Sequence, residues 1–292
     1  MKKINNVDSR LMWDIKVILE NGYQDENPRP KYSDGTPAHT YSVNQVIRMH
    51  NLAKDMFPIT TLRPIAWKSA IKEILWIYAD ESNSLELLHN KYGVKVWDEF
   101  ESKDIPGTIG ARYGETVRTY DLMNKLIKGL RENPFGRRHI IDLMQYEQLN
   151  KTDGLYPCAF CTMWSVRKVA NEDKLYLDMT LIQRSGDLCC ASSCGGWNEV
   201  QYAALMMMVA QCCDMNAGNF VHYVQNEQIY LRHEPQVKEM LQRISVDCFP
   251  KMKLNPNKKE IKDFTIDDFE LMDYPVDKIK KQNPQLKFEI AI

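Results

Sequence analysis

The sequence has no marked excess of one charge. Its 292 residues carry 38 Lys and Arg against 39 Asp and Glu, a formal net charge of −1. A protein that holds a nucleic-acid polymer needs a clear surplus of basic side chains to neutralise the phosphates. The balance therefore excludes DNA or RNA as the main partner, and it leaves room for a small local group of basic residues.

Long apolar runs and cysteines are also scarce. The longest apolar run, residues 203–210, is far shorter than the roughly 20 residues that cross a bilayer. Met1 is followed by basic and polar residues and not by the apolar core of a secretory signal. Eight cysteines are too few for a disulfide scaffold in a chain of this length. We therefore expect a cytoplasmic protein with reduced thiols and no membrane partner.

The chain also lacks any internal repeat, low-complexity tract or Ser/Gly-rich linker that would separate domains. Pro and Gly, 13 each, are scattered, and 44% of the residues are hydrophobic, which is enough for a sizeable core. Segments with the helical period occur together with segments that alternate as strands do. We predict one α+β domain over residues 1–292, with a mixed β-sheet packed on long helices.

Helices are expected where apolar residues recur every three or four positions. They are predicted at residues 8–20, 64–78, 82–92, 120–131 and 199–213, and from Pro235 onward. The segment 199–213 is apolar on nearly every side, which indicates a buried central helix. Strands are predicted at residues 139–144, 160–169, 175–183, 220–224, 228–231 and 286–292.

The cysteines gather in two places. Cys158 and Cys161 form a C-x-x-C pair, and Cys189, Cys190 and Cys194 lie close together in the sequence. Thiolates at such spacings can bind zinc. Side chains three apart on a strand point to opposite faces, however, and the second group lacks a matching C-x-x-C. A zinc or thiol-based binding module therefore stays open as an alternative, beside that of buried, inert thiols.

Cys158 differs from the other cysteines because it follows Tyr156-Pro157, a turn that leads into a strand. A cysteine nucleophile reacts as the thiolate, which needs cationic neighbours. The chain offers such neighbours at Arg137-Arg138 and at Arg184. Cys158 is therefore a candidate nucleophile.

Several short motifs then follow one another in a fixed order. They are Arg137-Arg138, Tyr156-Pro157-Cys158, Gln183-Arg184-Ser185 with Asp187, Asn198 with Tyr202, and Ile229-Tyr230. This series closely resembles the folate-dependent thymidylate synthases, a family whose fold is shared by pyrimidine hydroxymethylases. Counterparts of family segments also occur at residues 29–35, 57–61, 73–76, 97–99, 112–114 and 268–292. The resemblance covers essentially the whole chain.

The resemblance implies an activity, a fold and an assembly. The family converts dUMP to dTMP, and 5,10-methylenetetrahydrofolate serves as both one-carbon donor and reductant, without a metal. The implied fold is of the thymidylate synthase type. The implied assembly is a homodimer formed through the sheets, in which each subunit contributes residues to the partner's active site.

The resemblance also implies catalytic roles. Cys158 would add to C6 of uracil, which makes C5 nucleophilic. Arg184, close to this cysteine, would favour the thiolate. Glu73 would organise water for proton transfer, and Tyr113 would assist removal of the C5 proton. Asn198 would pair with O4 and N3–H of the base through its amide.

The remaining implied roles concern binding. The phosphate would lie among basic and hydroxyl groups, because guanidinium forks suit phosphate. These groups are Arg184, Ser185 and Arg29 from the same chain, and Arg137 and Arg138 from the partner. Tyr230 would bind the sugar hydroxyl beside Gln228. The folate would contact Asp187 and Trp97, and Ile292 would close over the complex.

Each role has an ordinary structural alternative. Asn198 with Gln201 fits an N-cap and capping box of the central helix. Glu73 fits a salt bridge with a lysine, and Arg137-Arg138 fit a solvated pair. Trp97 and Tyr113 fit core positions, and Asp187 fits a turn.

Three positions depart from the family pattern. Residues 188–197 form a longer segment than is usual, Gln228 replaces a histidine, and Ala159 follows Cys158. These changes keep a second function open, a pyrimidine nucleotide hydroxymethylase that admits water in place of hydride. Asn198 argues for a uracil nucleotide. Glu199 would read cytosine if the register slipped by one residue.

Overall fold

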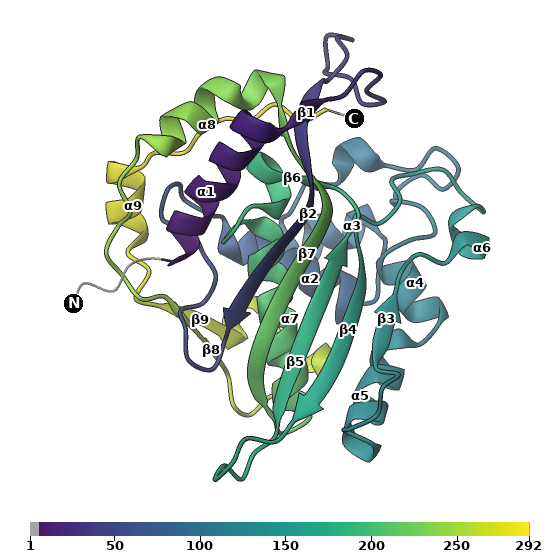
Figure 1. The fold of residues 1–292 in the computed structure, drawn as a ribbon. Helices are drawn as coiled ribbons and strands as arrows, with labels where there is room; N and C mark the ends of the chain where they lie inside the picture. The colour runs from purple at the N-terminus through teal and green to yellow at the C-terminus, as the bar shows by residue number, and fades with distance from the viewer. Residues whose placement is uncertain (1–5, 292) are drawn as a thin grey trace.

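A twisted mixed sheet forms the centre of the molecule (Figure 1), in a computed structural model that describes residues 6–291. Its strand order is β1-β2-β7-β5-β4-β3, and β6 pairs with β7 outside this path. The strands are β1 Tyr23–Gln24, β2 Thr40–Asn51, β3 Ile140–Asp142, β4 Ala159–Arg167, β5 Tyr176–Gln183, β6 Gly186–Asp187 and β7 Asn216–Tyr230. Strands β8 Lys251–Leu254 and β9 Phe269–Met272 form a separate antiparallel pair.

Strand β7 corrects the prediction of two strands at 220–224 and 228–231. It runs without a break because β2 pairs with it in antiparallel register from Thr40↔Tyr230 to Asn51↔Asn219. The polar residues in its middle suggested a turn, but Glu227 is buried and bonded to Arg48 of β2. Strand β2 itself was not predicted, since it places charged side chains on the core face.

The predicted helices are present with shifted ends, and α4, α6 and α9 were not predicted. They are α1 Asn6–Asn21, α2 Trp67–Tyr78, α3 Leu85–Leu87, α4 Gly114–Thr119, α5 Leu122–Glu132, α6 Tyr146–Leu149, α7 Trp197–Cys212, α8 Glu234–Leu241 and α9 Val276–Gln282. The predicted helix 82–92 continues from α3 as a π-turn over Leu88–Tyr92 and ends at Gly93, whose φ is +66°. The predicted helix 120–131 is α5, and α4 precedes it.

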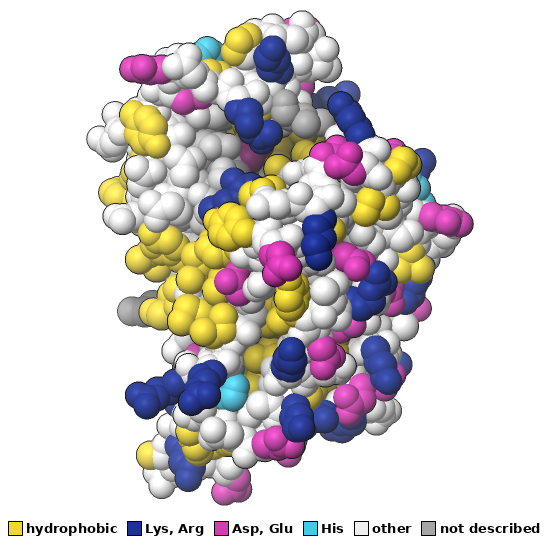
Figure 2. Space-filling model, turned by 90° about the vertical axis from the view of Figure 1, so that its right-hand side faces the viewer, with side chains coloured by type: hydrophobic (Ala, Val, Ile, Leu, Met, Phe, Trp, Pro, Cys, Tyr) yellow, Lys and Arg dark blue, Asp and Glu magenta, His cyan; other side chains and the backbone are white. Residues whose placement is uncertain are grey.

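The two faces of the sheet differ. Helices α7 and α2 pack behind it, and α7 is buried along most of its length (Figure 1). The other face carries exposed apolar side chains on β2, β3 and β4, and Figure 2 shows hydrophobic side chains gathered along its left-hand edge. These side chains, called here the open face, are Ile47, Met49, Ile140 and Met163.

The C-terminal segment also corrects a prediction. The expected strand 286–292 is irregular backbone over residues 286–291, where Leu286 and Phe288 pack on the apolar cluster between α1 and α8. Apolar alternation there reflects packing on that cluster, since this segment pairs with no strand in the described structure. Within residues 6–291, no helix is long and apolar enough to cross a membrane.

Candidate active site

Cys158 lies at the start of β4, just before an irregularity in the pairing with β5 between Ala159 and Cys161. Bulges of this kind re-aim the chain and are frequent beside active sites. The backbone N–H of Arg184 donates to the carbonyl of Cys158 at 2.9 Å, which holds the two motifs together. Arg184 Nη2 lies 3.5 Å from Cys158 Sγ. The structure therefore brings the predicted nucleophile and the predicted cation into contact.

Burial and the nearby positive charges act in opposite directions on the thiol of Cys158. Burial raises the pKa of Cys158 above its ordinary value, although the charges of Arg184 and Arg29 act to lower it. The prediction that Arg184 favours the thiolate is right in direction, but desolvation outweighs it. Further stabilisation of the thiolate would have to come from a bound substrate or from a second basic group.

Tyr113 contacts the same cysteine. Its hydroxyl oxygen accepts a hydrogen bond from the Cys158 backbone N–H at 3.1 Å, and its side chain is buried. Tyr113 has φ 53° and ψ −113°, a strained conformation for a residue with a Cβ. Strain of this kind persists where the surrounding structure enforces it, often at functional sites. Burial raises the pKa of Tyr113 well above its ordinary value, so its hydroxyl keeps its proton.

Glu73 is buried on α2 and does not form the lysine salt bridge considered as its structural alternative. Its Oε2 accepts a hydrogen bond from Trp197 Nε1 at 2.9 Å. Burial raises the pKa of Glu73, against the hydrogen-bonding effects of Gln201, Trp197 and Trp97. A carboxyl group whose pKa is raised toward neutrality can both hold and release a proton at the working pH.

Asn198 is not the N-cap of the central helix, as its structural alternative had it. The N-cap of α7 is Gly196, and Asn198 lies inside the first turn. Its Nδ2 donates to Gln201 Oε1 at 3.0 Å, and its Oδ1 accepts from Gln183 Nε2 at 3.2 Å. Gln201 and Gln183 therefore both hold the amide of Asn198. The loop at Gly195 explains why α7 begins before Asn198. Gly195, with φ +66°, leaves no space for a side chain beside Thr60 and sets the entry to α7.

Glu199 cannot replace Asn198 at the base. Its carboxylate is fully buried and accepts from His50 Nε2 at 3.0 Å and from the Gly195 N–H at 2.7 Å. This placement removes the alternative register in which Glu199 would read cytosine. The unusual segment before it folds as a π-turn over Leu188–Ser192, and the Asp187 carboxylate caps it by accepting from the N–H groups of Cys189 and Cys190.

The predicted phosphate ligands divide into two groups. Arg184 contacts Cys158, Ser185 follows Arg184 in the chain, and the charge of Arg29 acts to lower the pKa of the Cys158 thiol. Arg137 and Arg138 are exposed between α5 and β3, and among the described residues they form no hydrogen bond or ion pair. Figure 2 shows basic side chains beside a hollow on the face that includes α4, α5 and α6.

The predicted sugar and folate ligands lie on either side of this centre. Tyr230 is buried at the end of β7, edge-on to Tyr32 with ring centroids 6.2 Å apart. Gln228 pairs with Asp187 between β7 and β6. Trp97 is buried edge-on to Tyr113, with centroids 5.0 Å apart. Ile292 lies outside the described residues.

A pocket of about 510 Å³ lies beyond Glu73. Its lining is Arg63, Pro64, Ile65, Ala66, Cys190, Trp197, Gln285, Leu286, Lys287, Phe288 and Ile290. Trp197 links the pocket to Glu73, and the Arg63 guanidinium lies 5.3 Å from the Phe288 ring centroid. Neither Trp97 nor Asp187 lines it. Sequence reasoning missed Arg63, although it lies only two residues after the matched segment 57–61.

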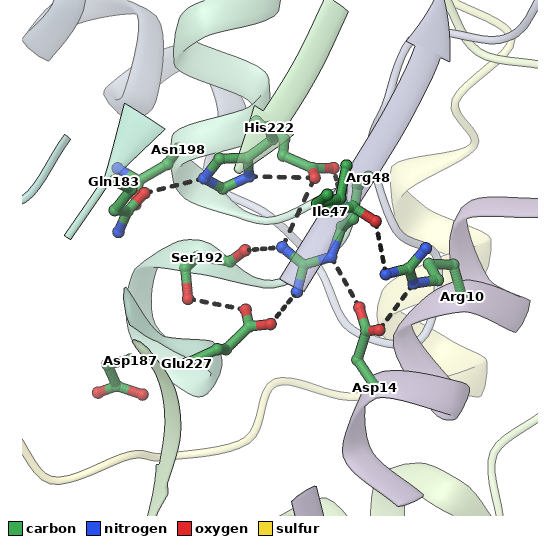
Figure 3. A network of polar contacts seen from close by, with 12 residues as sticks. Arg10, Asp14, Ile47, Arg48, Gln183, Asp187, Ser192, Asn198, His222 and Glu227 are labelled. Carbon is green, nitrogen blue, oxygen red and sulfur yellow. Dashed lines mark hydrogen bonds and ion pairs between the residues drawn. The ribbon is translucent and has the colours of Figure 1, made fainter. Parts of the chain in front are cut away.

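A buried ionic network behind the site was also missed (Figure 3). Arg48 donates to Asp14 at 2.7 Å, to the carbonyl of Ser192 at 2.7 Å and to Glu227. Ser192 Oγ donates to Glu227 at 3.0 Å. The network ties α1, β2, β7 and the segment 188–192 together, so it positions the wall that leads to Asn198.

Cys158 and Cys161, the C-x-x-C pair, lie in different surroundings. Cys161 pairs across the sheet with Ile182, while Cys158 lies beside Arg184. Among the described residues, two groups could hold a metal: His50, Cys194 and Glu199, and Asp187, Cys189 and His233. Neither includes Cys158 or Cys161. All eight thiols are free of disulfides.

Comparisons with known proteins agree with this geometry. The family model described as thymidylate synthase matches residues 12–292. The chain belongs to the thymidylate synthase family. The thymidylate synthase of Streptococcus mutans is 48% identical over 280 residues, which is 95% of this chain and 96% of that protein. That of Streptococcus pneumoniae is 46% identical over 290 residues, 99% of this chain and 100% of that protein.

A solved structure shows the same fold. Thermostable thymidylate synthase A from Bacillus subtilis superposes with a TM-score of 0.81 at 34% sequence identity, over 98% of this chain and 99% of that one. The predicted α+β fold of the thymidylate synthase type is therefore confirmed. Thymidylate synthases are methyltransferases, so the predicted enzyme class is confirmed with it.

Proposed function

We propose that this chain converts dUMP to dTMP with 5,10-methylenetetrahydrofolate, through a covalent adduct between Cys158 and C6 of the base. The observation that carries the proposal is the contact of Cys158 with both Arg184 and Tyr113, at 3.5 Å and 3.1 Å. Family membership supports the reaction. The hydroxymethylase alternative is not favoured, because the relatives matched over nearly the full length are thymidylate synthases.

The first step would be addition of the Cys158 thiolate to C6. A sulfur–carbon bond forms, and the electrons of the C5–C6 double bond move through C5 toward O4. Asn198 can meet the charge that develops on O4, because one N–H of its amide is not used by Gln201. The same amide oxygen can accept N3–H while it accepts from Gln183.

Activation of the thiol would come with the phosphate. Arg184 spends Nε and Nη2 on the carbonyls of Pro157 and Tyr156, while its Nη1 forms no hydrogen bond in residues 6–291. That free nitrogen and Ser185 Oγ are suited to a phosphate. When the substrate fills the site, Arg29 and the partner's arginines would add positive charge near Cys158, which opposes the effect of burial.

Later proton transfers would involve Tyr113 and Glu73. Tyr113 keeps its protonated hydroxyl within hydrogen-bond distance of the Cys158 backbone, so it is placed to orient a water in the chain that carries the C5 proton away. Glu73 lies behind Trp197, and burial, which raises its pKa, makes it a better proton carrier in that chain than an exposed glutamate.

The pocket beyond Glu73 fits the folate. Its apolar and aromatic lining suits a flat ring, and Lys287 and Arg63 at its rim suit the carboxylates of a glutamate tail. The co-substrate would supply the one-carbon unit and the hydride. Trp97 and Asp187 do not line the pocket, so their predicted folate contacts would require movement on binding.

We also propose that residues 1–292 act as one catalytic domain in a homodimer. The open face is the support for it, since Ile47, Met49, Ile140 and Met163 are between 45% and 69% exposed. Exposed apolar side chains gathered on one sheet face are typical of an interface between subunits. Arg137 and Arg138 lie in the segment just before β3, which carries Ile140 of this face, and a partner would bring them to the second Cys158.

The direct test is product analysis. The purified chain is incubated with dUMP and methylenetetrahydrofolate, and nucleotide and folate products are separated. The proposal expects dTMP with dihydrofolate, whereas a 5-hydroxymethyl nucleotide with tetrahydrofolate would establish the alternative. Cys158→Ser should lower turnover by about a thousandfold or more, because the weaker nucleophile has no activating base beside it. Cys189→Ser, a buried thiol on the same wall, is the matched control and should remain active.

A further inference from the structure

His222 connects the buried network to the residue that would read the base (Figure 3). It lies on the core face of β7, opposite Arg48 of β2 and beside Leu181 of β5. Its Nδ1 is 3.2 Å from Glu199 Oε1, and its Nε2 is 2.9 Å from Gln183 Oε1. The side chain is fully buried, so water cannot replace these partners.

The orientation of Gln183 follows from an obligate acceptor. Gln183 Nε2 lies 2.9 Å from the carbonyl oxygen of Ser185 and 3.2 Å from Asn198 Oδ1. A carbonyl can only accept, so the NH₂ group of Gln183 must face Ser185. The oxygen of the same amide must then face His222 Nε2, which has to carry a proton. A bare Nε2 would set two acceptors against each other at 2.9 Å.

The other ring nitrogen faces a carboxylate. Burial opposes the charge of Glu199, but His50, His222 and Arg48 outweigh it and hold the pKa of Glu199 well below its usual range. The 3.2 Å contact between Nδ1 and Oε1 holds the ring in place, while burial lowers the pKa of His222 against the opposing effect of Glu199. The charged groups around the ring are Glu199 from α7, Arg48 and His50 from β2, Asp14 from α1 and Glu227 from β7.

We propose that His222, held by Glu199, is a positioning residue that fixes the amide orientation of Asn198 through Gln183 and so makes the site prefer uracil to cytosine. The proposal rests on the proposed function, in which Asn198 pairs with the base. Each link is a hydrogen bond of 2.9–3.2 Å between buried or half-buried groups.

The chemistry of the two bases explains the preference. Uracil offers an acceptor at O4 and a donor at N3–H, and cytosine offers a donor at N4 and an acceptor at N3. With its oxygen held by Gln183 Nε2, Asn198 presents the order that matches uracil. Rotating the amide by half a turn would match cytosine, but it would set Asn198 Nδ2 against Gln183 Nε2. The chain of hydrogen bonds from Glu199 through His222 and Gln183 to Asn198, called here the relay, therefore disfavours the amide orientation that would match cytosine.

Two variants of equal polarity separate this role from a structural one. His222→Gln keeps an N–H at the position of Nε2 and loses the contact with Glu199, whereas His222→Asn keeps the contact with Glu199 and loses that with Gln183. The Kd values for dUMP and dCMP are measured without folate. His222→Asn should reduce the preference for dUMP by about five- to tenfold, the effect of one hydrogen bond, and His222→Gln by about twofold or less. Equal effects of both would overturn the proposal.

His50→Gln is the matched control, because His50 also bonds Glu199 but does not contact Gln183 in the described structure. It should lower thermal stability and leave the Kd ratio unchanged; a shifted ratio would contradict the relay. Nitrogen NMR of the His222 ring in the unaltered protein needs no variant. Protonated Nε2 supports the proposal, and a bare Nε2 refutes it even if the variants do not fold. If the unaltered protein does not bind dUMP, the proposed function fails, whereas the NMR result stands by itself.

Discussion

The buried arginines and the arginines proposed to bind the phosphate use their donors in opposite ways. Arg48 and Arg112 are almost fully buried, and each distributes its terminal nitrogens among partners in its own chain. Arg184 keeps Nη1 free in the described structure, and Arg137 and Arg138 keep every donor free there. Buried guanidinium groups must be paired, so the first kind holds the fold together. Donors that form no hydrogen bond in the described residues are available to bind the phosphate of a ligand.

Arg48 should give the largest effect. Arg48→Met leaves Asp14, Glu227 and Glu199 without their shared cation, and breaking a buried ion pair typically costs about 3–5 kcal/mol of unfolding free energy. Urea denaturation measures it. Arg10→Met is the control, because Arg10 bonds Asp14 from a partly exposed position and should cost about 1 kcal/mol or less. Equal losses of unfolding free energy in the two variants would show that the buried arginine is no more important for stability than the partly exposed one.

The network should also make stability sensitive to acid. The pKa of Glu199 is depressed in the folded state, so its contribution is full above the ordinary glutamate range and is lost progressively as the pH falls from there toward the lower pKa of the folded state. The urea midpoints of the unaltered protein and of Arg48→Met should therefore differ clearly at neutral pH and approach each other at acidic pH. Midpoints that fall in parallel would show that the network does not titrate.

Arg184 should come next and should affect function more than folding. Arg184→Ala removes the cation beside Cys158 and two proposed phosphate donors, so we expect kcat/KM for dUMP to fall about a hundredfold. Steady-state kinetics measures this loss. Arg118→Ala, on the exposed surface of α4, is the control and should leave kcat/KM unchanged. A loss confined to stability would place Arg184 with the buried group.

The reactivity of Cys158 sharpens the same contrast. Because burial raises its pKa above the ordinary 9.0, alkylation by iodoacetamide should be slow at neutral pH and should still increase above pH 9. Arg184→Ala should move the profile to higher pH, since the guanidinium charge favours the thiolate. The site of modification is followed by peptide mass spectrometry. A rate that levels off near neutral pH would contradict the burial argument.

The smallest expected effect is on stability at Arg137 and Arg138. The double change to Ala should alter the unfolding free energy by about 0.5 kcal/mol or less, because neither side chain is paired in residues 6–291. Calorimetry at a fixed protein concentration measures it. A larger loss would mean that these arginines hold subunits together and do not only await a ligand.

Sequence reasoning succeeded where a pattern is local. The helical period located α1, α2, α5 and α7, and the order of motifs singled out Cys158, Arg184 and Tyr113, which the structure brings into contact. It failed at β2, where Arg48 and His50 occupy the core face and break the usual alternation. Charged side chains can occupy those buried positions only because β2 pairs with β7, which brings Glu227 to Arg48. The sequence of β2 alone does not show this pairing.

The parts of the site that escaped prediction depend on register and on side-chain direction. Gln183, His222 and Glu199 lie on three different elements, and their contacts follow from the pairing of β5 with β7 and from the first turn of α7. The expected strand 286–292 failed for a similar reason, because apolar alternation describes a buried face and not the strand partner that is needed to form a sheet.

The most direct measurement is complementation between two inactive variants, which tests whether one phosphate is held by free arginines from two chains around one Cys158. Cys158→Ser and the Arg137→Ala/Arg138→Ala double variant are unfolded together, refolded at equal amounts and assayed for dTMP formation. If subunits exchange at random, half of the dimers are mixed and each has one intact site, so activity should return to about a quarter of that of the unaltered protein. No recovery above the separate variants would contradict the account, because the arginines would then serve the active site of their own chain.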